Sequence, residues 1–117
     1  MAEVLGSNLY VAGWALQGNL PPGRLAEILE GAVKRMGMNT EGLKPAIWQY
    51  PLPGGKGGVG HTVFQPLVES FIVADDYPEL NRTYVLAVSC LPFDRQIISR
   101  YLSRRVGRII NLGELVL

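Results

Sequence analysis

Turn-forming residues divide this chain into short segments, and this limits the folds open to it. The 117 residues include 14 glycines and 8 prolines, which favour turns and interrupt regular helices. The count argues against a bundle of long helices. A chain of this length fits one domain, 1–117, with a single hydrophobic core. The sequence shows no internal repeat and no linker that would divide it further.

Hydrophobic segments between these turn signals predict the order β-α-β-β-β-α-β. The β-like segment 62–74 contains Pro66, which predicts either an edge strand or a break between two strands. Segment 75–81, with its Asp75-Asp76 pair, is expected to be a turn region. The other predicted strands are 8–14, 46–50, 83–89 and 108–112.

Two segments have the periodicity of amphipathic helices. The first is expected to open at Pro21-Pro22-Gly23, and Asp94 is expected to cap the second. The sequence therefore predicts an α/β (α+β) two-layer sandwich, in which a mainly antiparallel sheet has two helices on one face. The predicted apolar faces are Leu25, Ile28, Leu29, Ala32, Val33 and Met36 in the first helix, and Ile97, Ile98, Tyr101 and Leu102 in the second.

Charge and cysteine content exclude several classes of function. Eleven basic and ten acidic residues give a formal charge of +1, which favours neither a nucleic acid nor a membrane surface as partner. One cysteine and one histidine exclude a disulfide framework and the usual zinc sites, so no metal is expected. The low charged fraction of 18% favours self-association through exposed apolar surface.

Targeting signals are not evident in the sequence. The first residues lack a basic region followed by an apolar stretch, and no apolar run approaches the roughly 20 residues that span a bilayer. We therefore expect a cytoplasmic protein.

The glycine-rich segment 54–62 resembles a phosphate-binding P-loop of the kind found in partitioning ATPases. Such a loop directs backbone N–H groups, a lysine and a hydroxyl toward phosphate and Mg²⁺. Here His61 replaces the final lysine, although Lys56 and Thr62 are present. The residues after this loop read as a strand, whereas a P-loop opens a helix. A hairpin or active-site loop is the favoured alternative.

A second candidate is a basic segment near the C-terminus. Its arginines can bind the phosphates of a nucleic acid, but no aromatic-rich RNA-binding motif accompanies them. A solvated helix face or a dimer contact is favoured instead. The arginines are Arg95, Arg100, Arg104, Arg105 and Arg108.

The third candidate is the pattern Glu69-Ser70, then Pro78-Glu79, then Cys90. This pattern resembles the small bacterial and archaeal S-adenosylmethionine decarboxylases, which have Glu-Ser-His, a second histidine, Pro-Glu and a cysteine at similar spacing. Segment 5–9 resembles the family's opening strand, and segment 60–62 falls where the family has Gly-x-Ser. The resemblance covers most of the chain, from about residue 5 to residue 111.

The resemblance implies a pyruvoyl enzyme of polyamine (spermidine) biosynthesis that cleaves its own backbone. Ser70 would become the pyruvoyl group and Glu69 the new C-terminus, and Cys90 would donate a proton to the decarboxylated carbon. The resemblance also implies a homodimer with active sites between protomers.

The implied substrate-binding residues lie elsewhere in the chain. Glu79 matches a carboxylate near the substrate ribose, and Trp48 or Tyr50 lies near the aromatic residue that stacks on adenine.

This chain departs from the family at three positions. Phe71 and Asp75 stand where the family has histidines, and Thr62 stands where it has the serine that assists processing. Asp75 takes the place of the histidine that extracts a proton, and aspartate is a weaker base at pH 7 than imidazole.

Three functions therefore stay open. The first is a decarboxylase of S-adenosylmethionine or a related amino-acid-like substrate. The second is an uncleaved, non-catalytic homologue that binds a nucleoside-like ligand or a protein partner. The third is a phosphate or nucleic-acid binder.

Overall fold

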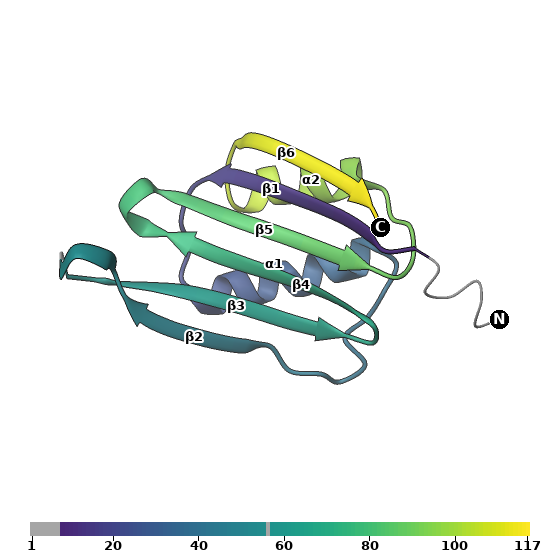
Figure 1. The fold of residues 1–117 in the computed structure, drawn as a ribbon, viewed down its shortest axis with the longest axis horizontal. Coiled ribbons are helices and arrows are strands. Elements are labelled where there is room, and N and C mark those ends of the chain that lie inside the picture. The colour runs from purple at the N-terminus through teal and green to yellow at the C-terminus, as the bar shows by residue number, and fades with distance from the viewer. Residues whose placement is uncertain (1–7, 56) are drawn as a thin grey trace.

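The computed structural model describes residues 8–55 and 57–117, which form one six-stranded sheet and two helices (Figure 1). The strands are β1 (Tyr10–Gln17), β2 (Ala46–Pro51), β3 (Val59–Leu67), β4 (Ser70–Tyr77), β5 (Arg82–Ser89) and β6 (Ile109–Val116). The helices are α1 (Pro22–Arg35) and α2 (Arg95–Arg105). The sheet order is β2-β3-β4-β5-β1-β6, and every neighbouring pair is antiparallel.

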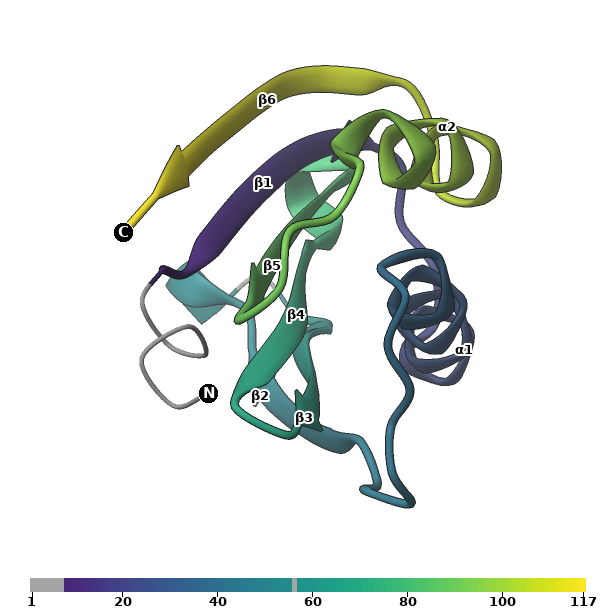
Figure 2. The same cartoon turned by 90° about the vertical axis from the view of Figure 1, so that its right-hand side faces the viewer.

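Both helices cover the same face of the sheet, as the side view shows (Figure 2). This gives the two-layer arrangement that the sequence predicts. We call the opposite side of the sheet, which neither helix covers, the free face. Because successive side chains of a strand point to opposite faces, each strand contributes alternately to the core and to the free face.

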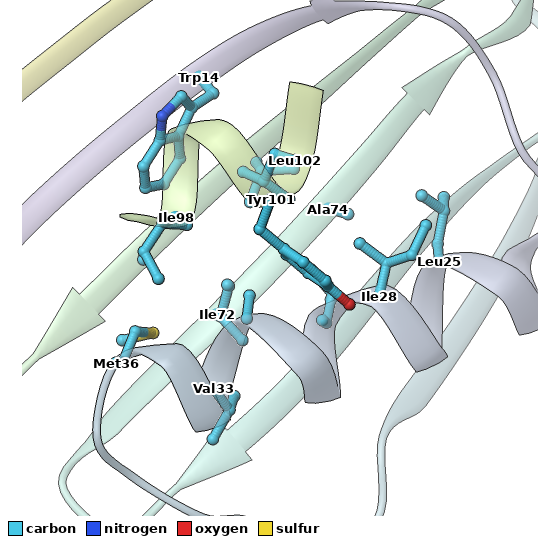
Figure 3. Close-up of a cluster of buried hydrophobic side chains, with 14 of the residues drawn as sticks. Trp14, Leu25, Ile28, Val33, Met36, Ile72, Ala74, Ile98, Tyr101 and Leu102 are labelled. Carbon is cyan, nitrogen blue, oxygen red and sulfur yellow. The ribbon is translucent and has the colours of Figure 1, made fainter. Parts of the chain in front are cut away.

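The hydrophobic core lies between the helices and the sheet (Figure 3). The five predicted residues within α1 are fully buried, and Met36, which follows the helix, is 4% exposed. From α2, Tyr101 reaches across to α1, where the guanidinium of Arg35 lies 3.9 Å from its ring centroid. The other core residues come from β1, β3, β4, β5 and α2, and include Trp14, Leu16, Val63, Ile72, Val85, Ile98 and Leu102.

Helix α2 confirms one predicted cap and corrects one predicted core residue. The Asp94 carboxylate accepts a hydrogen bond from the backbone N–H of Gln96 at 2.9 Å, as expected for an N-cap. Ile97, predicted to be buried, is 41% exposed. The buried stripe of this short helix is Ile98, Tyr101 and Leu102, and Ile97 lies beside that stripe.

The predicted turn at 75–81 is shorter than expected, because Asp75 and Asp76 belong to β4. Each carboxylate has a hydrogen-bond donor on the neighbouring strand β3. Thr62 donates to Asp75, and the backbone N–H of His61 donates to Asp76. These bonds compensate for placing two aspartates within a sheet. The turn itself is the short 3-10 helix Pro78–Leu80 with Asn81.

Segment 62–74 contains a break between two strands, one of the two outcomes that Pro66 predicts, but the break falls at 68–69 and not at Pro66. Pro66 pairs with Phe71 of β4. On its other side Pro66 has no partner in β2, because the pairing of β2 with β3 extends only as far as Ala46 and Phe64. Pro66 therefore occupies a local edge, where its missing N–H leaves no ladder bond unmade.

The terminal strands are longer than the sequence predicts, since β1 continues to Gln17 and β6 to Val116. Strand β3 begins at Val59, within the predicted glycine-rich loop. Residues 1–7, which carry part of the resemblance at 5–9, and Lys56 lie outside the described residues. Neither described helix is long and apolar enough to cross a bilayer.

Candidate functional site on the free face

Strand β4 divides the predicted site residues between the two faces of the sheet. Ser70 has the parity of the core residues Ile72 and Ala74 and points toward the helix layer. Asp75 has the opposite parity and points to the free face. Five residues of a strand span about 16 Å. The structure therefore does not bring the Asp75 carboxylate to Ser70.

Ser70 and Cys90 are brought together, although twenty positions separate them. Ser70 is the first residue of β4 and is 8% exposed. Its Oγ accepts a hydrogen bond of 2.9 Å from the backbone N–H of Cys90, which follows the end of β5. Within the described residues, this is the only hydrogen bond of the Ser70 side chain. Its donor is a backbone amide and not an acidic or basic side chain.

Glu69 lies in the turn between β3 and β4 and has a left-handed backbone, with φ = 56°. A non-glycine residue in this region is strained. Its side chain is exposed. The predicted cleavage position, the Glu69–Ser70 peptide bond, therefore follows a strained residue.

The other predicted catalytic residues form a hydrogen-bonded chain on the free face. The Thr62 hydroxyl donates to Asp75 Oδ1, and these two residues are direct partners in the β3–β4 register. The phenol oxygen of Tyr50 lies 3.4 Å from Thr62 Oγ1. Since Thr62 gives its proton to Asp75, Tyr50 is the donor to Thr62. The hydrogen bonds thus run from the Tyr50 phenol to the Thr62 hydroxyl and from there to Asp75 Oδ1. Within the described residues, this arrangement leaves Asp75 Oδ2 free for a ligand.

Burial raises the pKa of the Tyr50 phenol above its ordinary value of 10.0, and the Asp75 and Asp76 charges raise it further. Tyr50 is therefore protonated at neutral pH. Because the folded-state pKa is the higher one, the unfolded chain ionises first as pH rises, and stability falls at pH values above about 10.

This state of Tyr50 can be checked by titrating tyrosinate absorbance. We expect Tyr50→Phe to remove absorbance from the most alkaline part of the curve. A Tyr50→Phe curve that loses absorbance only below pH 10 would contradict the assignment.

Asp75 also borders a groove of about 400 Å³ on the free face. Gly13 of β1 lies directly opposite Gly113 of β6 in the strand register, and Ala15 lies opposite Asn111. Small side chains on two neighbouring strands leave a hollow over the sheet. The lining residues are Gly13, Trp14, Ala15, Val73, Asp75, Tyr84, Val85, Leu86, Asn111, Leu112 and Gly113.

Further aromatic side chains lie on the free face, in two pairs. The rings of Tyr77 and Tyr84 meet edge to face at 5.1 Å, and Trp48 packs against Phe64 at 6.5 Å. Trp48 is 55% exposed and is the direct register partner of Thr62. Both residues predicted to stack on adenine, Trp48 and Tyr50, therefore lie on the same face as Asp75. Glu79 is exposed in the turn beyond the end of β4.

A second polar cluster, which the sequence did not predict, lies on the helix side of the same strands. The Asp76 carboxylate accepts the backbone N–H of His61 at 2.7 Å and lies 3.4 Å from His61 Nδ1. His61 Nε2 lies 3.2 Å from Gln49 Oε1. The sequence could have indicated this cluster only if Asp75 and Asp76 had been assigned to a strand. Neighbouring residues of a strand point to opposite faces, so one of the two aspartates must then lie on the helix side.

The glycine loop and the arginine segment have mainly structural surroundings. The loop is followed by strand β3 and not by a helix, so the geometry of a P-loop is not formed. Arg95 contacts Glu114 at 2.5 Å, and the Arg105 guanidinium lies 5.4 Å from the Tyr101 ring centroid. Two of the five arginines therefore have partners within the domain.

Comparison with known proteins places the fold. No protein-family model and no curated protein matches the chain. Among solved structures, the chain is similar to the adenosylmethionine decarboxylase from Aquifex aeolicus VF5, with a TM-score of 0.56 and 19% identity. The match covers 94% of this chain and 88% of that chain. The predicted fold is thus confirmed: the chain has an adenosylmethionine decarboxylase-like α+β fold.

Proposed function

We propose that this protein binds a cationic, nucleoside-like small molecule of the S-adenosylmethionine type on its free face, with the Glu69–Ser70 bond intact. The observation that carries the proposal is the position of Asp75. Its carboxylate borders the groove, on the face of the sheet opposite to Ser70. Within one chain, Asp75 is thus placed to meet a ligand and is not placed to extract a proton near Ser70.

The charge and shape of the groove support a ligand that combines apolar surface with a positive charge. A volume of about 400 Å³ lies within the range of small-molecule sites. The walls are mostly apolar, with Leu86 and the Tyr84 ring among them. No lysine or arginine of the described residues forms an ion pair with Asp75. A sulfonium or ammonium group would supply the missing counter-charge.

Within one chain, the surroundings of Ser70 supply no base for self-processing. Conversion to a pyruvoyl group starts when the serine oxygen attacks the preceding carbonyl, which needs a base for the hydroxyl proton. In the described residues, no carboxylate or imidazole hydrogen-bonds to Ser70 Oγ.

Decarboxylation is the second candidate, and the contact between Ser70 and Cys90 favours it. Intact mass of the purified protein after prolonged incubation separates the two candidates. The binding proposal predicts a single chain. Two fragments divided between Glu69 and Ser70 would favour the decarboxylase, and splitting only in Asp75→His would indicate a lapsed enzyme.

Removal of the Asp75 charge tests the binding proposal. Asp75→Asn keeps the size of the side chain and an oxygen for Thr62. We expect it to weaken S-adenosylmethionine binding by about tenfold to a hundredfold, the usual worth of a hydrogen-bonded charge, as measured by calorimetry. The matched control is Glu27→Gln, which removes an equal charge from an exposed position on α1. Equal affinities for the two variants would contradict the proposal.

A further inference from the structure

Arg82 is a cationic side chain on the free face, the face that carries the groove. It is the first residue of β5 and lies opposite Tyr77 of β4 and Gln17 of β1. It shares its parity with Tyr84 and Leu86, which both line the groove. Its Nη1 lies 3.4 Å from the hydroxyl of Tyr84. The guanidinium therefore reaches a group on the wall of the groove.

Apart from the Tyr84 contact, no hydrogen bond of the Arg82 side chain is formed within the described residues. Its Nε is buried and has no hydrogen-bond partner. No carboxylate of these residues lies within ion-pair distance of the guanidinium. A buried donor without a partner costs about 1 to 3 kcal/mol. An anion bound to this guanidinium would provide the negative charge that the described residues do not.

Asp75 and Arg82 lie on either side of the same residue. Asp75 is the direct register partner of Tyr84, and Arg82 lies two positions from Tyr84 on the same strand. Such diagonal neighbours are about 7 to 8 Å apart between their Cα atoms, yet the two side chains do not pair with each other. A negative and a positive group thus flank one tyrosine, and each lacks a partner of opposite charge.

We propose that Asp75 and Arg82 together bind the head group of an α-amino acid. Arg82 binds the carboxylate, for which its planar guanidinium is suited. Asp75 binds the ammonium group through the carboxylate oxygen that Thr62 leaves free. The rest of the ligand lies along the groove. This inference rests on the proposed function and narrows it: the ligand is a zwitterion that retains its carboxylate.

One consequence distinguishes this site from one built only for a cation. A ligand that has lost its carboxylate keeps its attraction to Asp75 but leaves Arg82 without an anion. A ligand that lacks the whole amino-acid part loses both contacts. Affinity is therefore expected to fall in the order S-adenosylmethionine, decarboxylated S-adenosylmethionine, 5′-methylthioadenosine.

Calorimetry with these three compounds and one variant tests the inference. For the wild-type chain we expect S-adenosylmethionine to bind about tenfold to a hundredfold more tightly than its decarboxylated form, as expected for a charge-assisted hydrogen bond. In Arg82→Gln this preference is expected to disappear, while 5′-methylthioadenosine binds as it does to the wild type. Arg82→Lys, which keeps the charge but not the planar fork, is expected to retain part of the preference.

A matched control is Arg100→Gln, which removes an exposed arginine from α2 on the covered side of the sheet. It is expected to leave all three affinities unchanged. Equal binding of S-adenosylmethionine and its decarboxylated form to the wild type would overturn the role of Arg82 but leave the proposed function standing. Failure of all three compounds to bind would overturn both.

Discussion

Gly113→Phe is expected to weaken ligand binding by nearly a hundredfold and to leave the fold intact. A Cβ at position 113 meets no atom within 4 Å, and Gly113 lines the groove on the edge strand β6. A phenyl ring there would fill space that the ligand needs. Loss of about 100 Å² of buried apolar ligand surface costs about 2.5 kcal/mol, which is nearly a hundredfold in affinity.

Calorimetry with S-adenosylmethionine measures this effect, and thermal unfolding verifies the fold. Leu115→Phe is the matched control, because Leu115 lies two positions along the same strand and does not line the groove. We expect it to bind as the wild type does. A Gly113→Phe protein that is folded and binds with unchanged affinity would show that the ligand lies elsewhere.

Gly107→Ala is expected to destabilise the fold by at least about 3 kcal/mol, at the upper end of what overpacking costs. Gly107 joins α2 to β6, and the backbone there runs against the end of β1. A Cβ at this position would overlap the carbonyl oxygen of Gln17 and lie 2.9 Å from its carbonyl carbon. These are backbone atoms, and the N–H of Gln17 is itself bonded to the Arg108 carbonyl at 2.8 Å. No side-chain rotation can relieve the overlap.

Urea unfolding monitored by tryptophan fluorescence measures this change. The control is Gly23→Ala, near the start of α1, where an added Cβ meets nothing within 4 Å. Alanine is a better helix former than glycine, so this control is expected to stabilise the protein by about 0.5 to 1 kcal/mol. Similar changes in both variants would contradict the packing described for Gly107.

Local patterns in the sequence were sufficient for most of the fold. The apolar spacing from Leu25 to Val33 predicted α1, and Asp94 predicted the start of α2, because both signals depend on residues within a few positions. The prediction was wrong for Asp75 and Asp76, which looked like turn residues. Their place in β4 depends on hydrogen bonds from β3, and such partners are not visible in a local pattern.

The candidate site was predictable only in part, because it depends on strand register. Ser70 and Cys90 were singled out by the family resemblance, and the structure brings these two residues into contact. The groove requires Gly13 and Gly113, from opposite ends of the chain, to be paired across β1 and β6. The role proposed for Arg82 follows from its position beside Tyr84 on the free face. The homodimer expected from the family resemblance stays a prediction.

Calorimetric titration of the purified protein with S-adenosylmethionine, on a sample whose intact mass is recorded before and after, tests the central claim most directly. The proposed function predicts saturable binding at one site per chain by a protein that keeps the full mass of its 117 residues. Absence of binding, or a sample divided between Glu69 and Ser70, would contradict it.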